Sequence, residues 1–346
     1  MSHPSLSPRR SLAALTLLIA AWLTACSNVA ASAPSGSGES TVLSIVGYAV
    51  PAEANARIAE AWQQTPDGQD VTFETSYGAS GDQSRNVLNG QPADYVHFSV
   101  ESDVTRLVDG GLVSPDWKSG PNKGVVSTSV VVLAVRSGNP LGIKGWDDLI
   151  KPGVEIVTPN PASSGAARWN ILAAWAHIAA NGGSDAEATD FLKKLLGNAV
   201  ALPGSGRDAT TAFTSGTGDV FITYENEAIL ARQSGADFDY IVPDDTLLIE
   251  NPGTVLIDAK PAATQWLDFV LSDQAQEIFG ETGFRPLNGK APARVEGAND
   301  PENPFPQPQR LYTIANDFGS WEELSKTFFA EQTGIVTQLL AELGKS

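Results

Sequence analysis

The chain of 346 residues is poor in the side chains that bind metals and nucleic acids. It has one cysteine and three histidines. An internal disulfide, a cysteine-rich zinc site and an iron–sulfur cluster are therefore excluded, and no metal or cofactor is expected. Basic residues number 22 against 40 acidic ones, a formal net charge of −18. Because nucleic acids and anionic membranes attract basic surfaces, neither is expected as the main partner.

After its N-terminal segment, the sequence also lacks an apolar run of about 18 residues, the length that indicates a membrane-spanning helix. The apolar run 12–23 follows an arginine pair, which is typical of a secretory signal over residues 1–25. The run ends in Leu-Thr-Ala-Cys and resembles a bacterial lipobox, which implies a lipid on the sulfur of Cys26. The alternatives are an ordinary signal peptide with a nearby thiol, or export by the twin-arginine route, which the residues after the arginine pair fit poorly.

Residues 26–40 consist mainly of Ser, Ala, Gly and Pro. Such a segment cannot bury enough apolar surface to fold, so it is expected to be a flexible tether. The protein is therefore expected to be exported and lipid-anchored on the outer face of the cytoplasmic membrane. Hydrophobic residues form 42% of the sequence, enough for a core, and the length favours two domains or lobes.

In the body of the chain, β-branched runs alternate with segments of helical periodicity, which predicts an α/β fold with mainly parallel sheets. The expected strands are 42–46, 71–75, 94–98, 125–135, 156–157 and 220–224, and the expected helices are 55–64, 102–108, 166–180, 265–279 and 321–343.

Three turns of small residues, 76–83, 158–166 and 203–210, follow expected strands and open expected helices. A helix start leaves backbone N–H groups unpaired and carries a partial positive charge, so an anion can bind there. Ordinary capping by Ser and Asp and turning at Gly explain any single turn equally well. Three such turns together favour an anion site. None of them has the sequence of a phosphate-binding P-loop or a dinucleotide-binding turn.

The stretch 158–175 (TPNPASSGAARWNILAAW) resembles the signature of periplasmic sulfate-binding proteins of ABC importers, and so do 77–83 and 218–228. The resemblance implies the class II periplasmic-binding fold, in which two α/β lobes joined by two crossing strands close on a dehydrated oxyanion. The expected crossings lie near 131–135 and 245–249. They assign residues 41–132 and 248–346 to the first lobe and 133–247 to the second.

The resemblance also implies ligand contacts through backbone N–H groups, Ser hydroxyls and one aromatic donor. Tyr224 stands where the family's enteric members have a Trp, and the Ala49-Val50 turn replaces an Asp-Pro pair. Alanine replaces the second glycine of the family's Ser-Gly-Gly turn. The implied contacts are Val50, Ser80, Ser164, Gly165, Ala166, Gly206 and Tyr224.

Four charged residues lie in or beside these turns. Arg168 and Arg207 match family arginines that sit behind the turns, and surface ion pairs are the alternative. Asp82 and Asp208 are expected either to stabilise helix N-termini or to accept a proton from phosphate and so set the choice of oxyanion. The polar triplet 225–227 is either support for the site or a solvated turn.

Sulfate carries no proton at neutral pH, so a site made of donors alone suits it. Phosphate keeps a proton, so it binds better where the site also has an acceptor. The sequence therefore predicts a sulfate receptor, expected to be a monomer, that delivers the ion to an ABC permease and its ATPase. Thiosulfate, molybdate and phosphate are the rival ligands. The alternative class is a secreted hydrolase of phosphate or sulfate esters with Ser164 as nucleophile, but no nucleophile elbow surrounds that serine.

Overall fold

A computed structural model describes residues 40–345. The predicted signal segment, Cys26 and nearly all of the predicted tether lie outside the described residues. The strands are β1 (Thr41–Tyr48), β2 (Val71–Gly78), β3 (Tyr95–His97), β4 (Val125–Arg136), β5 (Ile156–Val157), β6 (Ala199–Ala201), β7 (Val220–Tyr224), β8 (Phe238–Ile241), β9 (Asp245–Val255) and β10 (Arg310–Tyr312). The helices are α1 (Ala52–Trp62), α2 (Ser80–Leu88), α3 (Glu101–Asp109), α4 (Gly165–Ala179), α5 (Asp185–Gly197), α6 (Gly206–Thr214), α7 (Glu225–Gln233), α8 (Pro261–Val270), α9 (Asp273–Glu281), α10 (Trp321–Phe328) and α11 (Ile335–Glu342), with a short 3₁₀ helix, η1 (Trp146–Ile150), and a π-helical turn, η2 (Ile314–Phe318).

The strands of residues 40–345 follow the order β2-β1-β3-β9-β4-β7-β5-β6, with β10 beside β9 and β8 beside β4. At one end, β1 pairs in parallel with β2 and β3. At the other end, β5 pairs in parallel with β6 and β7. We call β1–β3 with α1–α3, α8 and α9 the first half, and β5–β8 with α4–α7 the second half.

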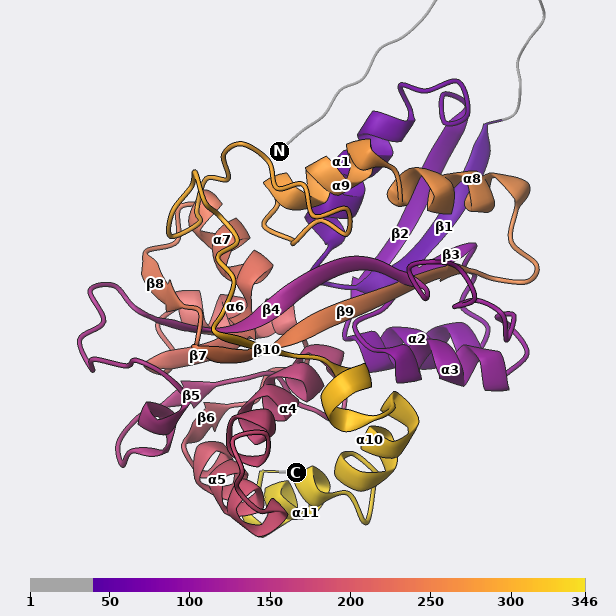
Figure 1. Ribbon diagram of the computed structural model, residues 1–346. Helices are drawn as coiled ribbons and strands as arrows, with labels where there is room; N and C mark the ends of the chain where they lie inside the picture. The colour runs from indigo at the N-terminus through magenta and orange to yellow at the C-terminus, as the bar shows by residue number, and fades with distance from the viewer. Residues whose placement is uncertain (1–39, 346) are drawn as a thin grey trace, which may run out of the picture. The chain divides into compact units, whose positions relative to one another are not determined.

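Strands β4 and β9 connect the two halves and lie antiparallel to each other (Figure 1). Residues 125–130 of β4 pair with β9, whereas residues 131–136 pair with β7 and β8 of the second half. The far end of β9 pairs with β3 of the first half. The expected α/β fold with two crossing strands is therefore confirmed.

The C-terminal segment contacts both halves. Helix α10 packs on α3 of the first half, and α11 packs on α5 of the second. The ammonium of Lys345 donates to the carbonyl oxygens of Leu196, Gly197 and Ala199 at 2.7–2.8 Å. We propose that the lobe boundaries are those expected from the sequence, with residues 321–345 acting as a bridge between the lobes.

Two long helices expected from the sequence are each divided. The segment 265–279 contains the end of α8 and most of α9, because Ser272 accepts a hydrogen bond from Ala275 N and begins a new helix. The segment 321–343 contains α10 and α11, separated by a turn that includes Gly334. The sequence does contain local signals at both breaks, a Ser-Asp pair at 272–273 and Gly334.

The cores of the two halves consist of the apolar side chains of the strands and of the helix faces that cover them. In the first half, the rings of Trp62, Phe73 and Trp266 have centroids 5.0–5.9 Å apart. These aromatic contacts hold α1 and α8 against β2. No helix among residues 40–345 is both long enough and apolar enough to span a bilayer.

Candidate anion-binding site

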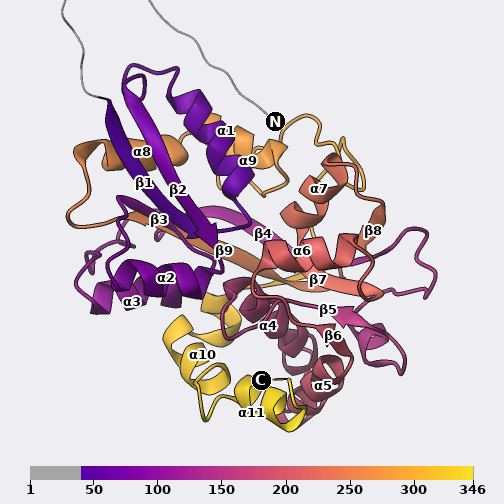
Figure 2. The ribbon, with the colours of Figure 1, turned by 180° about the vertical axis from the view of Figure 1, so that it is seen from behind.

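The candidate site lies where parallel strands end and helices begin. Strands β1 and β2 lead into α1 and α2, whereas β5 and β6 lead into α4 and α6. Figure 2 shows the carboxyl ends of β1 and β2 directed toward α6. Ligands of open α/β sheets bind at this edge, because helix N-termini converge there.

Three contacts between the halves bring these helix starts together. Gly81 N donates to Ser163 O at 3.0 Å. The guanidinium of Arg207 donates to Val50 O at 3.0 Å. A Cβ on Gly206 would lie 3.1 Å from Val50 Cγ2, so only a very small residue fits there. The predicted contact residues of both halves therefore meet in one place.

Five of the predicted contact residues present a backbone N–H that has no acceptor among residues 40–345. They are Val50, Ser80, Gly165, Ala166 and Gly206. All five residues are buried. A buried donor without a partner costs about 1–3 kcal/mol. Five of them in one place suit a ligand that offers several acceptor oxygens.

The hydroxyl of Ser164 is also unengaged. Ser164 occupies the N-cap of α4, but its side chain accepts no capping hydrogen bond, and its exposed fraction is 2%. The N-cap serines of α5, α6, α9 and α10 all accept one. A serine at this position normally accepts a hydrogen bond from its own helix. The Ser164 hydroxyl has no partner among the described residues, so it is available to a ligand.

The hydroxyl of Ser80 is not available to a ligand, because it already has protein partners. Its hydroxyl donates to the carboxylate of Asp103 at 2.6 Å and accepts from Ser99 N at 2.9 Å. Asp103 is 1% exposed and also receives a hydrogen bond from Arg106 at 2.9 Å. The buried carboxylate holds the proton of Ser80, so the backbone amide is the group that Ser80 offers to a ligand.

Tyr224 is placed at the junction as expected, but its hydroxyl has a protein partner. The oxygen lies 2.7 Å from Ser99 Oγ, and either atom can donate. Burial is the main reason that the pKa of Tyr224 is raised above its usual value, so the phenol stays protonated. The sequence did not point to Ser99, because nothing in the stretch after β3 distinguishes it from an ordinary turn serine.

The two predicted supporting arginines touch the turns from behind. Arg207 bridges Val50 O and the carboxylate of Glu227, the latter at 2.7 Å. Arg168 donates to Pro161 O and to Ser102 Oγ, both at 3.3 Å. Burial lowers the pKa of Arg168. Each guanidinium thus fixes a turn that carries candidate donors.

The two aspartates that were candidate proton acceptors are exposed and contact other side chains. Asp82 is exposed and pairs with Arg85 on the surface of α2. Asp208 is exposed and accepts a hydrogen bond from Ser205 Oγ at 2.8 Å. These positions agree with carboxylates that stabilise helix N-termini. They do not agree with carboxylates that accept a proton from bound phosphate.

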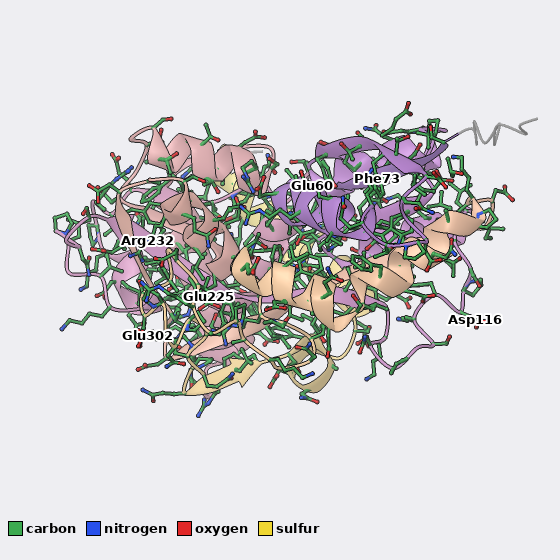
Figure 3. The ribbon with its side chains drawn as sticks, turned by 90° about the horizontal axis from the view of Figure 1, so that it is seen from above. Glu60, Phe73, Asp116, Glu225, Arg232 and Glu302 are labelled. Carbon is green, nitrogen blue, oxygen red and sulfur yellow. The ribbon has the colours of Figure 1, made fainter. Side chains whose placement is uncertain are left out.

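The triplet 225–227 begins α7 and is buried, so it is not a solvated turn. Glu225 is buried and pairs with Arg285 at 2.7 and 3.1 Å. Figure 3 shows Glu225 on the same side of the molecule as Arg232 and Glu302. Glu227 is 2% exposed and holds Arg207, so it fixes the guanidinium that contacts the Val50 turn.

Neither His97 nor His177 forms a hydrogen bond with Ser164. His97 contacts Asn55 and Ser127, and burial lowers its pKa to about 3. His177 contacts Asp245 and Asp147. No group of three metal-ligating side chains in this range is placed to hold an ion.

Comparison with known proteins places the chain in a family. A model of the bacterial extracellular solute-binding proteins matches residues 43–285. The chain belongs to this family. A sulfate-binding protein of Synechococcus elongatus is 38% identical over 92% of both chains. A thiosulfate-binding protein of Pseudomonas aeruginosa is 34% identical over 81% of this chain and 85% of its own.

A solved structure gives the same result for the fold. The sulfate-binding protein of Mycobacterium tuberculosis H37Rv is 42% identical, with a TM-score of 0.78. The match covers 84% of this chain and 100% of that one. The resemblance to sulfate-binding proteins that residues 158–175 predicted is therefore confirmed for the chain as a whole.

Proposed function

We propose that the protein is the extracytoplasmic sulfate-binding component of an ABC importer. The observation that carries the proposal is the set of donors at the junction of the halves. Five buried backbone N–H groups and the Ser164 hydroxyl lack acceptors among residues 40–345. The relatives that are named for sulfate binding support the same ligand.

The charge of the site favours an anion that carries no proton. Asp103, the carboxylate that contacts Ser80, has both oxygens engaged by Ser80 and Arg106. A hydroxyl group on the ligand would therefore meet donors and lose its own hydrogen bond, which costs about 1–3 kcal/mol when buried. Sulfate has no proton that needs an acceptor, whereas hydrogen phosphate has one.

Capture requires the two halves to separate and close. The contacts of Gly81 with Ser163 and of Arg207 with Val50 join the halves directly over the candidate site. Opening breaks these contacts and lets the anion enter, and closure removes it from water. A permease with its ATPase then receives the closed form. A monomer held by a lipid on Cys26 and the tether 26–40 remains close to that partner.

Calorimetric titration of the exported protein, with residues 1–25 removed, tests the proposal. Sulfate, thiosulfate, molybdate and phosphate are compared in sulfate-free buffer. We expect sulfate to bind at micromolar concentrations or below and phosphate to give no heat. Tight binding of phosphate, or no response to millimolar sulfate, would contradict the proposed ligand. A preference for thiosulfate would keep the receptor role and change the cargo.

A further inference from the structure

Two buried hydroxyl groups from opposite halves meet beside the candidate site. Ser99 follows β3 of the first half, and Tyr224 ends β7 of the second. Their oxygens are 2.7 Å apart, and the exposed fractions of the two residues are 0% and 1%. The pair therefore joins the two halves in this structure.

The backbone of Ser99 is held firmly in place. Its N–H donates to Ser80 Oγ at 2.9 Å. Its carbonyl accepts from the indole of Trp169 at 2.8 Å and from the amide of Asn251 at 2.9 Å. A Cβ built on Gly165 would lie only 2.7 Å from Ser99 Oγ. The hydroxyl thus lies against Gly165, the first residue of α4.

The two hydroxyls carry two protons, and one of them is used between the oxygens. A phenol is more acidic than an aliphatic alcohol and is the better donor. With Tyr224 as the donor, the proton of Ser99 is left over. Ser99 Oγ has no other hydrogen-bond partner among residues 40–345. The remaining proton can therefore be given to a ligand at the start of α4.

We propose that the Ser99 hydroxyl is a direct donor to the bound anion and that Tyr224 is a positioning residue that directs it. This inference rests on the proposed function. A tyrosine that donates to Ser99 Oγ occupies one of the two lone pairs of that oxygen and leaves the serine proton for the ligand, so the serine is oriented as a donor. The pair therefore adds to the preference for a fully ionised oxyanion.

The test compares the wild-type protein with Ser99→Ala, Tyr224→Phe and the double variant. Dissociation constants are measured for sulfate and, by competition, for phosphate. We expect Ser99→Ala to weaken sulfate binding about 10- to 150-fold, the loss of one hydrogen bond to a charged partner. Tyr224→Phe should weaken sulfate binding less than Ser99→Ala does. It should also lower the preference for sulfate over phosphate, because the serine hydroxyl is then no longer oriented as a donor and both of its lone pairs are free to accept. The double variant should bind no more weakly than Ser99→Ala.

The control removes a buried hydroxyl outside the site. Thr246 is fully buried and donates to Val131 O at 2.6 Å. Thr246→Val should lower the melting temperature and leave both dissociation constants unchanged. If Ser99→Ala does not fold, Ser99→Cys replaces it, since a thiol is a weak donor of similar shape.

The outcomes separate the two proposals. Wild-type protein that ignores sulfate contradicts the proposed function. Wild-type protein that binds sulfate, together with a Ser99→Ala or Ser99→Cys variant of equal affinity, overturns the role of Ser99. The positioning role of Tyr224 is overturned by two results together. The effects of Ser99→Ala and Tyr224→Phe on sulfate binding are additive, and Tyr224→Phe leaves the ratio of the sulfate and phosphate dissociation constants unchanged.

Discussion

Replacing Ser164 by Ala separates ligand binding from stability. The hydroxyl of Ser164 has no hydrogen-bond partner among residues 40–345, although the residue is the N-cap of α4 and is buried. Its removal therefore breaks no bond in the ligand-free protein. A hydrogen bond to a charged partner contributes about 1.5–3 kcal/mol. We expect the dissociation constant for sulfate to rise about 10- to 150-fold in calorimetric titration.

A matched serine gives the opposite result. Ser272 is the N-cap of α9, away from the site, and it accepts a hydrogen bond from Ala275 N. Ser272→Ala should reduce the free energy of unfolding by about 0.5–2 kcal/mol, as the loss of an N-cap does, and leave sulfate affinity unchanged. Urea unfolding without ligand checks both variants. The reasoning is refuted if Ser164→Ala binds sulfate as the wild type does, or if it loses as much stability as Ser272→Ala.

Two further predictions concern the closed form and pH. Gly165→Ala should abolish sulfate binding in titration, because the new Cβ would lie 2.6 Å from Ser99 Cβ; retained binding would mean that α4 approaches the anion differently. Burial lowers the pKa of His177, but hydrogen bonds and charge from Asp245 and Asp147 outweigh it, and the net pKa is raised. His177 therefore stabilises the folded protein fully below the ordinary pKa of about 6.5, and this contribution should be lost as the pH rises through the raised pKa. Urea unfolding across this range should show a steeper loss for the wild type than for His177→Gln, and equal slopes would contradict the assignment.

The helix starts were predictable from the sequence because their signals are local. Small residues after a β-branched run mark 76–83, 158–166 and 203–210, and each of these turns does open a helix. The five unpaired amides all lie at positions that the family resemblance had indicated. Backbone donors depend on where helices begin, and residue type at the turn decides that.

Partners of the side chains were not predictable, because they come from distant parts of the chain. Tyr224 meets Ser99 across 125 positions, and Tyr48 meets Asn251 across 203. The sequence shows that Ser80 has a hydroxyl but not that Asp103 takes its proton. It likewise gives no sign that Ser164 leaves its own helix uncapped.

Asp103 shows how an acidic protein presents donors to an anion. A buried carboxylate this close to the site would repel sulfate if an oxygen were free. Ser80 engages one oxygen at 2.6 Å and Arg106 engages the other at 2.9 Å. The guanidinium offsets the negative charge, and the serine hydroxyl occupies the other oxygen of the carboxylate. Because each oxygen of Asp103 already has a hydrogen-bond partner, we expect this carboxylate to offer little attraction to a proton on the ligand.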